Sequence, residues 1–114
     1  MEINVRESQG VTVFDLSGRI IGADSNQLKQ AIDQSIEESE KPKLLFNLSG
    51  VSMLDSTGLG TLVGSHLSAS RKGGRIGIIN VAEGAQSILI IAKLVSVLER
   101  FESEAEAVDA LTSS

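Results

Sequence analysis

The chain has 114 residues, enough for one hydrophobic core and too few for a second, so we expect a single domain over residues 1–114. Hydrophobic residues make up 41% and charged residues 22%, which is the composition of a globular protein and not of a disordered one. The net charge of −5 makes nucleic acid a poor partner, and the lack of cysteine excludes a disulfide framework, a thiolate metal site and a cysteine nucleophile.

The first half of the chain predicts a hairpin, a helix and a buried strand. Apolar residues alternate with polar ones on both sides of a turn signal at Gln9-Gly10, as in a β-hairpin. From Ser25, a favourable N-cap, apolar residues follow helical spacing until Pro42 stops the helix. The apolar run over 43–48 then has the length of a strand.

The second half of the chain predicts helices and strands in alternation. Its expected elements are a helix from Asp55 to Gly73-Gly74, a strand over 75–80, a helix over 84–93, a strand or extended segment over 96–101, and a terminal helix opened by the capping box Ser103-Glu104-Ala105-Glu106.

The resulting order, ββαβαβαβα, predicts an α/β domain with a mixed, mostly parallel sheet of about five strands and four main helices. The first strand is expected to be antiparallel at or near an edge. Loops that leave the carboxyl ends of parallel strands share one rim of the sheet, where sites in open α/β folds usually lie. We expect the loops over 18–25, 49–56 and 80–83 at this rim.

The sequence contains neither a recognisable signal peptide nor a candidate transmembrane segment. The N-terminal segment MEINVRES has neither the basic start nor the apolar core of a signal peptide, and no apolar run is long enough to span a bilayer. We therefore expect a cytoplasmic protein that does not insert into a membrane.

The segment MLDSTGLGTLVG, residues 53–64, combines hydroxyl and carboxylate side chains with glycines where the second helix begins. With Asp55 as N-cap, Leu54 and Leu59 take the positions of a hydrophobic staple, and Ser56 becomes the first helical residue. Its hydroxyl then lies beside unpaired N–H groups at the positive end of the helix dipole. A phosphate is tolerated at such a position.

The two faces of this helix differ in composition. The residues at core spacing are Leu59, Leu62, Val63 and Leu67. The other face carries the small or hydroxylated residues Thr57, Gly60, Thr61, Gly64 and Ser68. Because each helical glycine costs about 1 kcal/mol relative to alanine, the glycines indicate either a docking surface or a close helix contact within the domain, and the spacing does not decide between them.

Catalytic interpretations of this segment are weak. The third glycine of GLGTLVG is one position late for a dinucleotide loop, and neither GxxxxGK[ST] nor GxSxG occurs. The only histidine, His66, follows Ser56 by ten residues, roughly 15 Å along a helix and too far for proton transfer. We expect no metal site and no cofactor. An enzyme is the minor alternative, and Ser56 suits the role of another enzyme's substrate better than that of a nucleophile.

The longer segment LLFNLSGVSMLDSTGLGTLVGS resembles the signature of the STAS domain in bacterial anti-sigma-factor antagonists. The similarity extends over the whole chain, through the Gly18 turn and the terminal Glu104-Ala105-Glu106-Ala107 helix. The resemblance implies a partner switch without catalytic residues. In that family the unphosphorylated antagonist binds an anti-sigma factor that is also a serine kinase. Phosphorylation of the serine after the aspartate, here Ser56, breaks the complex, and a metal-dependent phosphatase restores it.

The resemblance also implies which residues form the site. Ser56 is the expected phosphate acceptor, with Thr57 as the second choice. The expected contacts with the partner are Asp24, Asp55, Ser56, Thr57, Gly58, Gly60, Thr61 and Gly64. The alternative is a scaffold subunit of a signalling or lipid-transport complex, in which the same helix docks without phosphorylation.

The first rim loop departs from the family pattern. Many members carry an acidic pair in a G-[ED]-L-D turn, whereas this chain has the sequence Gly18-Arg19-Ile20-Ile21-Gly22, with Asp24 later. The acidic pair is associated with contacts to the kinase, so the identity of the partner stays open. From its expected place at the rim, Arg19 is a candidate neighbour of a phosphate on Ser56.

Overall fold

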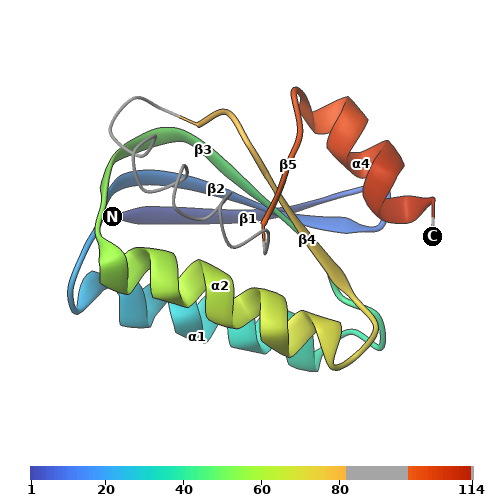
Figure 1. Cartoon of the computed structure of the whole chain (residues 1–114), viewed down its shortest axis with the longest axis horizontal. Coiled ribbons are helices and arrows are strands. Elements are labelled where there is room, and N and C mark those ends of the chain that lie inside the picture. The colour runs from blue at the N-terminus through green and yellow to red at the C-terminus, as the bar shows by residue number, and fades with distance from the viewer. Residues whose placement is uncertain (82–97, 114) are drawn as a thin grey trace.

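The computed structural model describes residues 1–81 and 98–113, and it shows a sheet with helices on both faces (Figure 1). The strands are β1 (Glu2–Ser8), β2 (Val11–Ile20), β3 (Lys43–Leu54), β4 (Arg75–Ile79) and β5 (Glu99–Arg100), and the helices are α1 (Asp24–Glu37), α2 (Ser56–Ser70) and α4 (Glu104–Thr112). Within these described ranges, every helix is too short or too polar to cross a bilayer.

The strands lie in the order β1-β2-β3-β4-β5, and all neighbours run parallel except β1 and β2. This confirms the predicted α/β domain, its mixed and mostly parallel sheet, and its antiparallel first strand at an edge. Three helices belong to the described residues, and the fourth expected helix, over 84–93, lies outside them. Of the strand expected over 96–101, the described part forms only the short β5.

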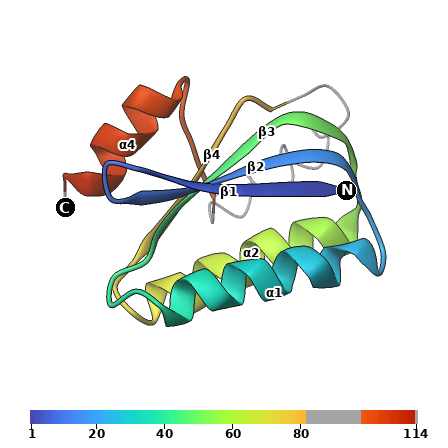
Figure 2. The ribbon, with the colours of Figure 1, turned by 180° about the vertical axis from the view of Figure 1, so that it is seen from behind.

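The two faces of the sheet are covered by different helices. Figure 2 shows α1 and α2 side by side on one face and α4 on the other. Because neighbouring residues of a strand point to opposite faces, Phe14 and Phe46 are buried under α1 and α2, with ring centroids 5.3 Å apart. Val13 and Leu45 are buried in the second cluster, together with Leu111 of α4.

The strands β2 and β3 run further than the sequence predicts. The register shifts twice along this pair, and Gly18 stands at one of the shifts with a φ of +89°. Such irregularities bend a strand without ending it. The expected loop over 49–56 was therefore wrong for most of its length, because pairing continues to Leu54. The loop expected over 18–25 begins only after Ile20 and ends before Asp24, so it is shorter than predicted.

The helix α1 begins differently from the prediction. Ser25 is not its N-cap, because the helix already starts at Asp24 and the Ser25 side chain is buried. A backbone turn leads into the helix instead, in which Asp24 N–H donates to Ile21 O at 3.1 Å and Ser25 N–H donates to Gly22 O at 3.1 Å. The chain therefore passes from β2 into α1 through three residues.

Candidate functional site

The start of α2 is fixed by Asp55, as predicted. Asp55 has an extended backbone, and its Oδ1 accepts the Gly58 N–H at 2.8 Å. Leu59 N–H donates to the Asp55 carbonyl at 2.9 Å, so Ser56 is the first residue of the helix. The bonded Gly58 N–H, more than any other group, holds the pKa of the Asp55 carboxyl below its ordinary value. The cap is therefore a carboxylate at neutral pH.

Ser56 and Thr57 are exposed in the first turn of α2. Ser56 thus stands exposed at the positive end of a 15-residue helix. His66 lies ten residues further along the same helix, which confirms that it is not beside Ser56. In the part of the chain that the structure describes, no three His, Cys, Asp or Glu side chains gather as a metal site.

The buried side of α2 differs from the predicted one. Its buried residues are Gly58, Leu62, Ser65 and Ala69. Leu67, which was expected in the core, has 53% of its surface exposed. Ser65 and Ala69, which the predicted core spacing did not include, lie on the buried side, where their small side chains allow close packing. The prediction of a buried Leu67 was therefore wrong.

Gly58 is a packing residue and does not lie on an open contact surface. A Cβ at this position would lie 2.4 Å from the Ile20 carbonyl oxygen and 2.6 Å from Leu54 Cδ1. Its assignment to the contact surface was therefore wrong. Gly60 and Gly64 are exposed, and apart from α2 itself no described residue has a heavy atom within 4 Å of a Cβ built on either. Close packing among the described residues thus explains Gly58 and not the other two glycines.

The ends of β2 and β3 bring the first rim loop to the start of α2. Arg19 is the sheet neighbour of Met53, whose side chain is 47% exposed. Gly22 N–H donates to Asp55 Oδ2 at 3.0 Å, a bond that the sequence did not predict. Arg19 and Asp24 are exposed at this rim. Figure 1 shows the β2–α1 connection and the start of α2 at the same end of the sheet.

Arg19 is placed beside the segment that leads to Ser56. It pairs with a residue three positions before Ser56, and no ion pair among residues 1–81 and 98–113 involves it. Its guanidinium is therefore available to an anion at the rim. The signal for this placement was the parallel pairing of the two strands, because it aligns their carboxyl ends.

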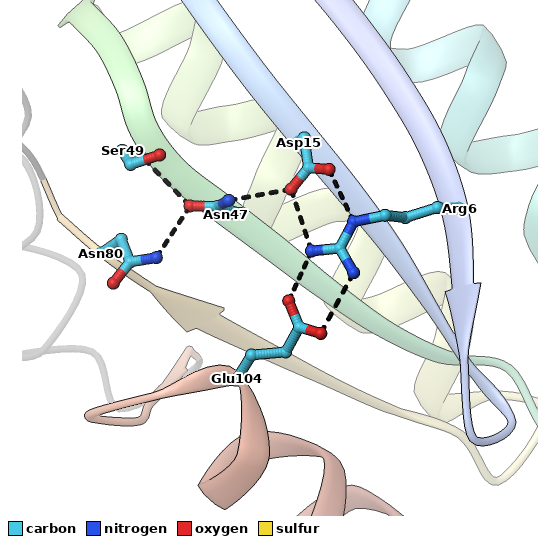
Figure 3. A network of polar contacts seen from close by, with 6 residues as sticks. All are labelled: Arg6, Asp15, Asn47, Ser49, Asn80 and Glu104. Carbon is cyan, nitrogen blue, oxygen red and sulfur yellow. Dashed lines mark hydrogen bonds and ion pairs between the residues drawn. The ribbon is translucent and has the colours of Figure 1, made fainter.

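A polar network that the sequence analysis missed crosses the sheet face that α4 covers (Figure 3). Arg6 donates from Nε to Asp15 Oδ2 at 2.7 Å and from Nη1 to Glu104 Oε2 at 3.0 Å. Asn47 donates to Asp15 Oδ1 at 2.8 Å and accepts from Asn80 at 3.1 Å. The network thus joins β1, β2 and β3 to each other, to the residue after β4 and to the first residue of α4.

Comparison with known proteins identifies the kind of domain. Residues 2–107 match the sequence model of the STAS domain. The chain is 22% identical over 111 residues to an anti-sigma F factor antagonist of Paenibacillus polymyxa, and the match covers 97% of this chain and 95% of the relative.

Solved structures show the same fold. An anti-sigma factor antagonist from Mycobacterium paratuberculosis matches with a TM-score of 0.83 and 23% identity, over 96% of this chain and 92% of that one. The phosphorylated form of the Bacillus cell fate determinant SpoIIAA matches with a TM-score of 0.71 and 19% identity, over 96% and 98% of the two chains.

Proposed function

The chain belongs to the STAS domain family, and from this premise we propose that it is an anti-sigma-factor antagonist controlled by phosphorylation of Ser56. In the unphosphorylated form it binds an anti-sigma factor that is also a serine kinase, and in the phosphorylated form it releases this partner. A metal-dependent serine phosphatase reverses the modification. The chain itself is a substrate of these enzymes and not a catalyst, and it acts in the cytoplasm.

The observation that carries the proposal is the exposed Ser56 directly after the Asp55 N-cap, at the positive end of α2. A phosphate there adds a charge of about −1.5 to −2 and three acceptor oxygens. The helix N-terminus tolerates this charge, so the domain stays folded. A partner that packs against a small hydroxyl does not tolerate it, because the phosphate is bulky and strongly hydrated.

The proposed partner surface surrounds this serine. Along α2 it runs over the exposed Gly60 and Gly64, where the absence of side chains lets a partner approach the helix backbone. At the rim it includes Asp24, Asp55 and Met53. Thr57 and Thr61 complete it, and Arg19 is the residue that we propose beside the phosphate.

Mapping the acceptor tests this proposal. After incubation with the cognate kinase and ATP, peptide mass spectrometry should place one phosphate on Ser56, because its hydroxyl is exposed at the helix start. Ser56→Ala should abolish the modification, whereas Thr57→Ala, one residue further along the same exposed turn, should not. Phosphate on Thr57 alone, or none on the wild type, would refute Ser56 as the acceptor.

A further inference from the structure

The Asp55 carboxylate ties two segments together, because each of its oxygens accepts a backbone N–H from a different one. Oδ1 accepts from Gly58, in the first turn of α2, at 2.8 Å. Oδ2 accepts from Gly22 at 3.0 Å. Gly22 is the middle residue of the β2–α1 loop, residues 21–23. The side chain that caps α2 therefore also holds this loop.

The two glycines that donate to Asp55 differ in how closely they are packed. At Gly58 a Cβ would lie 2.4 Å from the Ile20 carbonyl oxygen, and the Asp55 N–H donates to the same carbonyl at 3.4 Å. Gly22 is exposed, with a φ of +53°, and beyond its chain neighbours no heavy atom of the described residues lies within 4 Å of a Cβ built on it. The start of α2 is thus held against β2 by packing, whereas Gly22 is held to the start of α2 by a hydrogen bond.

The other hydrogen bonds of the β2–α1 loop do not connect it to α2. Asp24 N–H donates to Ile21 O, Ser25 N–H to Gly22 O and Asn26 N–H to Ala23 O, each at 3.1 Å. These bonds shape the turn into α1 from within. Among the described residues, the hydrogen bond from Gly22 to Asp55 is the one that joins this loop to the start of α2.

A phosphate on Ser56 would act first on this bond. The phosphate is attached to the residue next to Asp55, whose carboxyl is charged at neutral pH and whose pKa the bond from the Gly58 N–H lowers further. Carboxylate and phosphate repel each other and compete for the same N–H groups at the positive end of α2. The contact with the exposed Gly22 can yield to this repulsion without disturbing the core, whereas the packed contact at Gly58 cannot.

We propose that Asp55 transmits phosphorylation of Ser56 to the β2–α1 loop, because the phosphate weakens the bond from Gly22 N–H to Asp55 Oδ2 and frees the loop. The loop leads directly into the exposed Asp24, and the exposed Arg19 lies two residues before it at the end of β2, so the modification acts on the rim next to the proposed partner surface. This mechanism rests on the proposed function for the origin of the phosphate, but the response of the loop depends only on the phosphate being present.

The test uses the full chain with phosphoserine installed at position 56 by genetic encoding, so that no kinase is needed. Water-exchange NMR should show the Gly22 amide exchanging about fivefold faster than in the unmodified chain, the effect expected from the loss of one net hydrogen bond. Phosphoserine at Ser52, which is exposed on β3, adds the same charge away from the helix and should leave Gly22 unchanged.

A second variant removes the hydrogen bond from Gly22 to residue 55 and keeps the helix cap. Asp55→Ser keeps one oxygen for the Gly58 N–H and loses the one that reaches Gly22, so Gly22 exchange should be fast without phosphate. Phosphorylation should then add no further increase, because its route to the loop is gone. If Asp55→Ser fails to fold, Asp55→Asn, which also keeps one oxygen, takes its place.

Unchanged Gly22 exchange in the phosphorylated wild type would overturn the proposal, and so would an equal acceleration by phosphate in the Asp55→Ser background. A different pattern would separate this mechanism from the proposed function. If encoded phosphoserine frees the loop but the cognate kinase never modifies Ser56, the proposed function fails and the coupling stands.

Discussion

Replacing Gly58 with alanine is expected to lower the free energy of unfolding by about 2–3 kcal/mol. The added Cβ would lie 2.4 Å from the Ile20 carbonyl oxygen and 2.6 Å from Leu54 Cδ1, so the first turn of α2 must move away from β2. Overpacking of this kind outweighs the better helix propensity of alanine, which favours the substitution by about 1 kcal/mol. Urea unfolding followed by circular dichroism measures the difference.

The matched control is Gly60→Ala, two residues further along the same helix. Beyond the adjacent residues and backbone of α2, no heavy atom in the described part of the chain lies within 4 Å of a Cβ built on Gly60, so alanine there should stabilise the chain by about 1 kcal/mol. The two substitutions are chemically identical and should have opposite signs. If Gly58→Ala is as harmless as Gly60→Ala, α2 does not start against β2 as described, and the placement of Ser56 fails with it.

Replacing Arg6 with methionine is expected to cost about 1–2 kcal/mol at pH 7, because it leaves the carboxylates of Asp15 on β2 and Glu104 on α4 without their shared cation. Arg6 bonds both Asp15 and Glu104, which links β1 and β2 to the start of α4. The expected cost is kept low because the Arg6 and Glu104 side chains are 38% and 36% exposed, so water screens the pair.

The cost of Arg6→Met should depend on pH. Hydrogen bonds from Arg6 are the main reason that the pKa values of Asp15 and Glu104 lie below their ordinary values. Carboxyls with a lowered pKa in the folded state contribute stability above their unfolded pKa and lose it as the pH falls through the folded pKa. The difference between Arg6→Met and the wild type should therefore be full at pH 7 and shrink below about pH 4.

An exposed ion pair of the same chain serves as the control for this prediction. Lys29 and Asp33 are one turn apart on α1, with a contact of 2.7 Å and side chains that are 64% and 43% exposed. Lys29→Met should cost less than about 0.5 kcal/mol at any pH. The prediction is wrong if Arg6→Met lowers the free energy of unfolding no more than Lys29→Met does, or if its effect is the same at pH 7 and pH 3. Either result would show that the Arg6 network does not stabilise the packing of α4.

Local signals in the sequence predicted most of the fold. Asp55 and Ser103 each cap a helix through bonds to N–H groups three residues later, at Gly58 and Glu106, so a short window of sequence suffices to find them. The order of the elements likewise predicted the parallel sheet with an antiparallel edge strand, because crossover connections leave few topologies.

The features that the sequence did not predict depend on contacts between distant segments. Arg6 and Glu104 are 98 residues apart, and Asp55 and Gly22 are 33 apart, so no spacing rule connects them. The burial of Gly58 depends on where β2 ends, and β2 runs further than expected because its irregular register keeps it paired with β3. The sequence therefore predicted the motif and placed the 18–25 loop at the same rim, while the hydrogen bond that joins them, from Gly22 to Asp55, needed the structure.

The most direct test of the proposed phosphorylation switch is the affinity of the chain for its cognate anti-sigma factor. It is measured by calorimetry with and without phosphoserine at position 56. The unmodified chain should bind, and phosphorylation should weaken binding by about a hundredfold or more, which corresponds to about 2.7 kcal/mol. Ser56→Ala should bind like the unmodified chain, because alanine is small and uncharged. Equal affinities of the phosphorylated and unmodified chains would contradict the switch and indicate a scaffold that docks through α2 without phosphorylation.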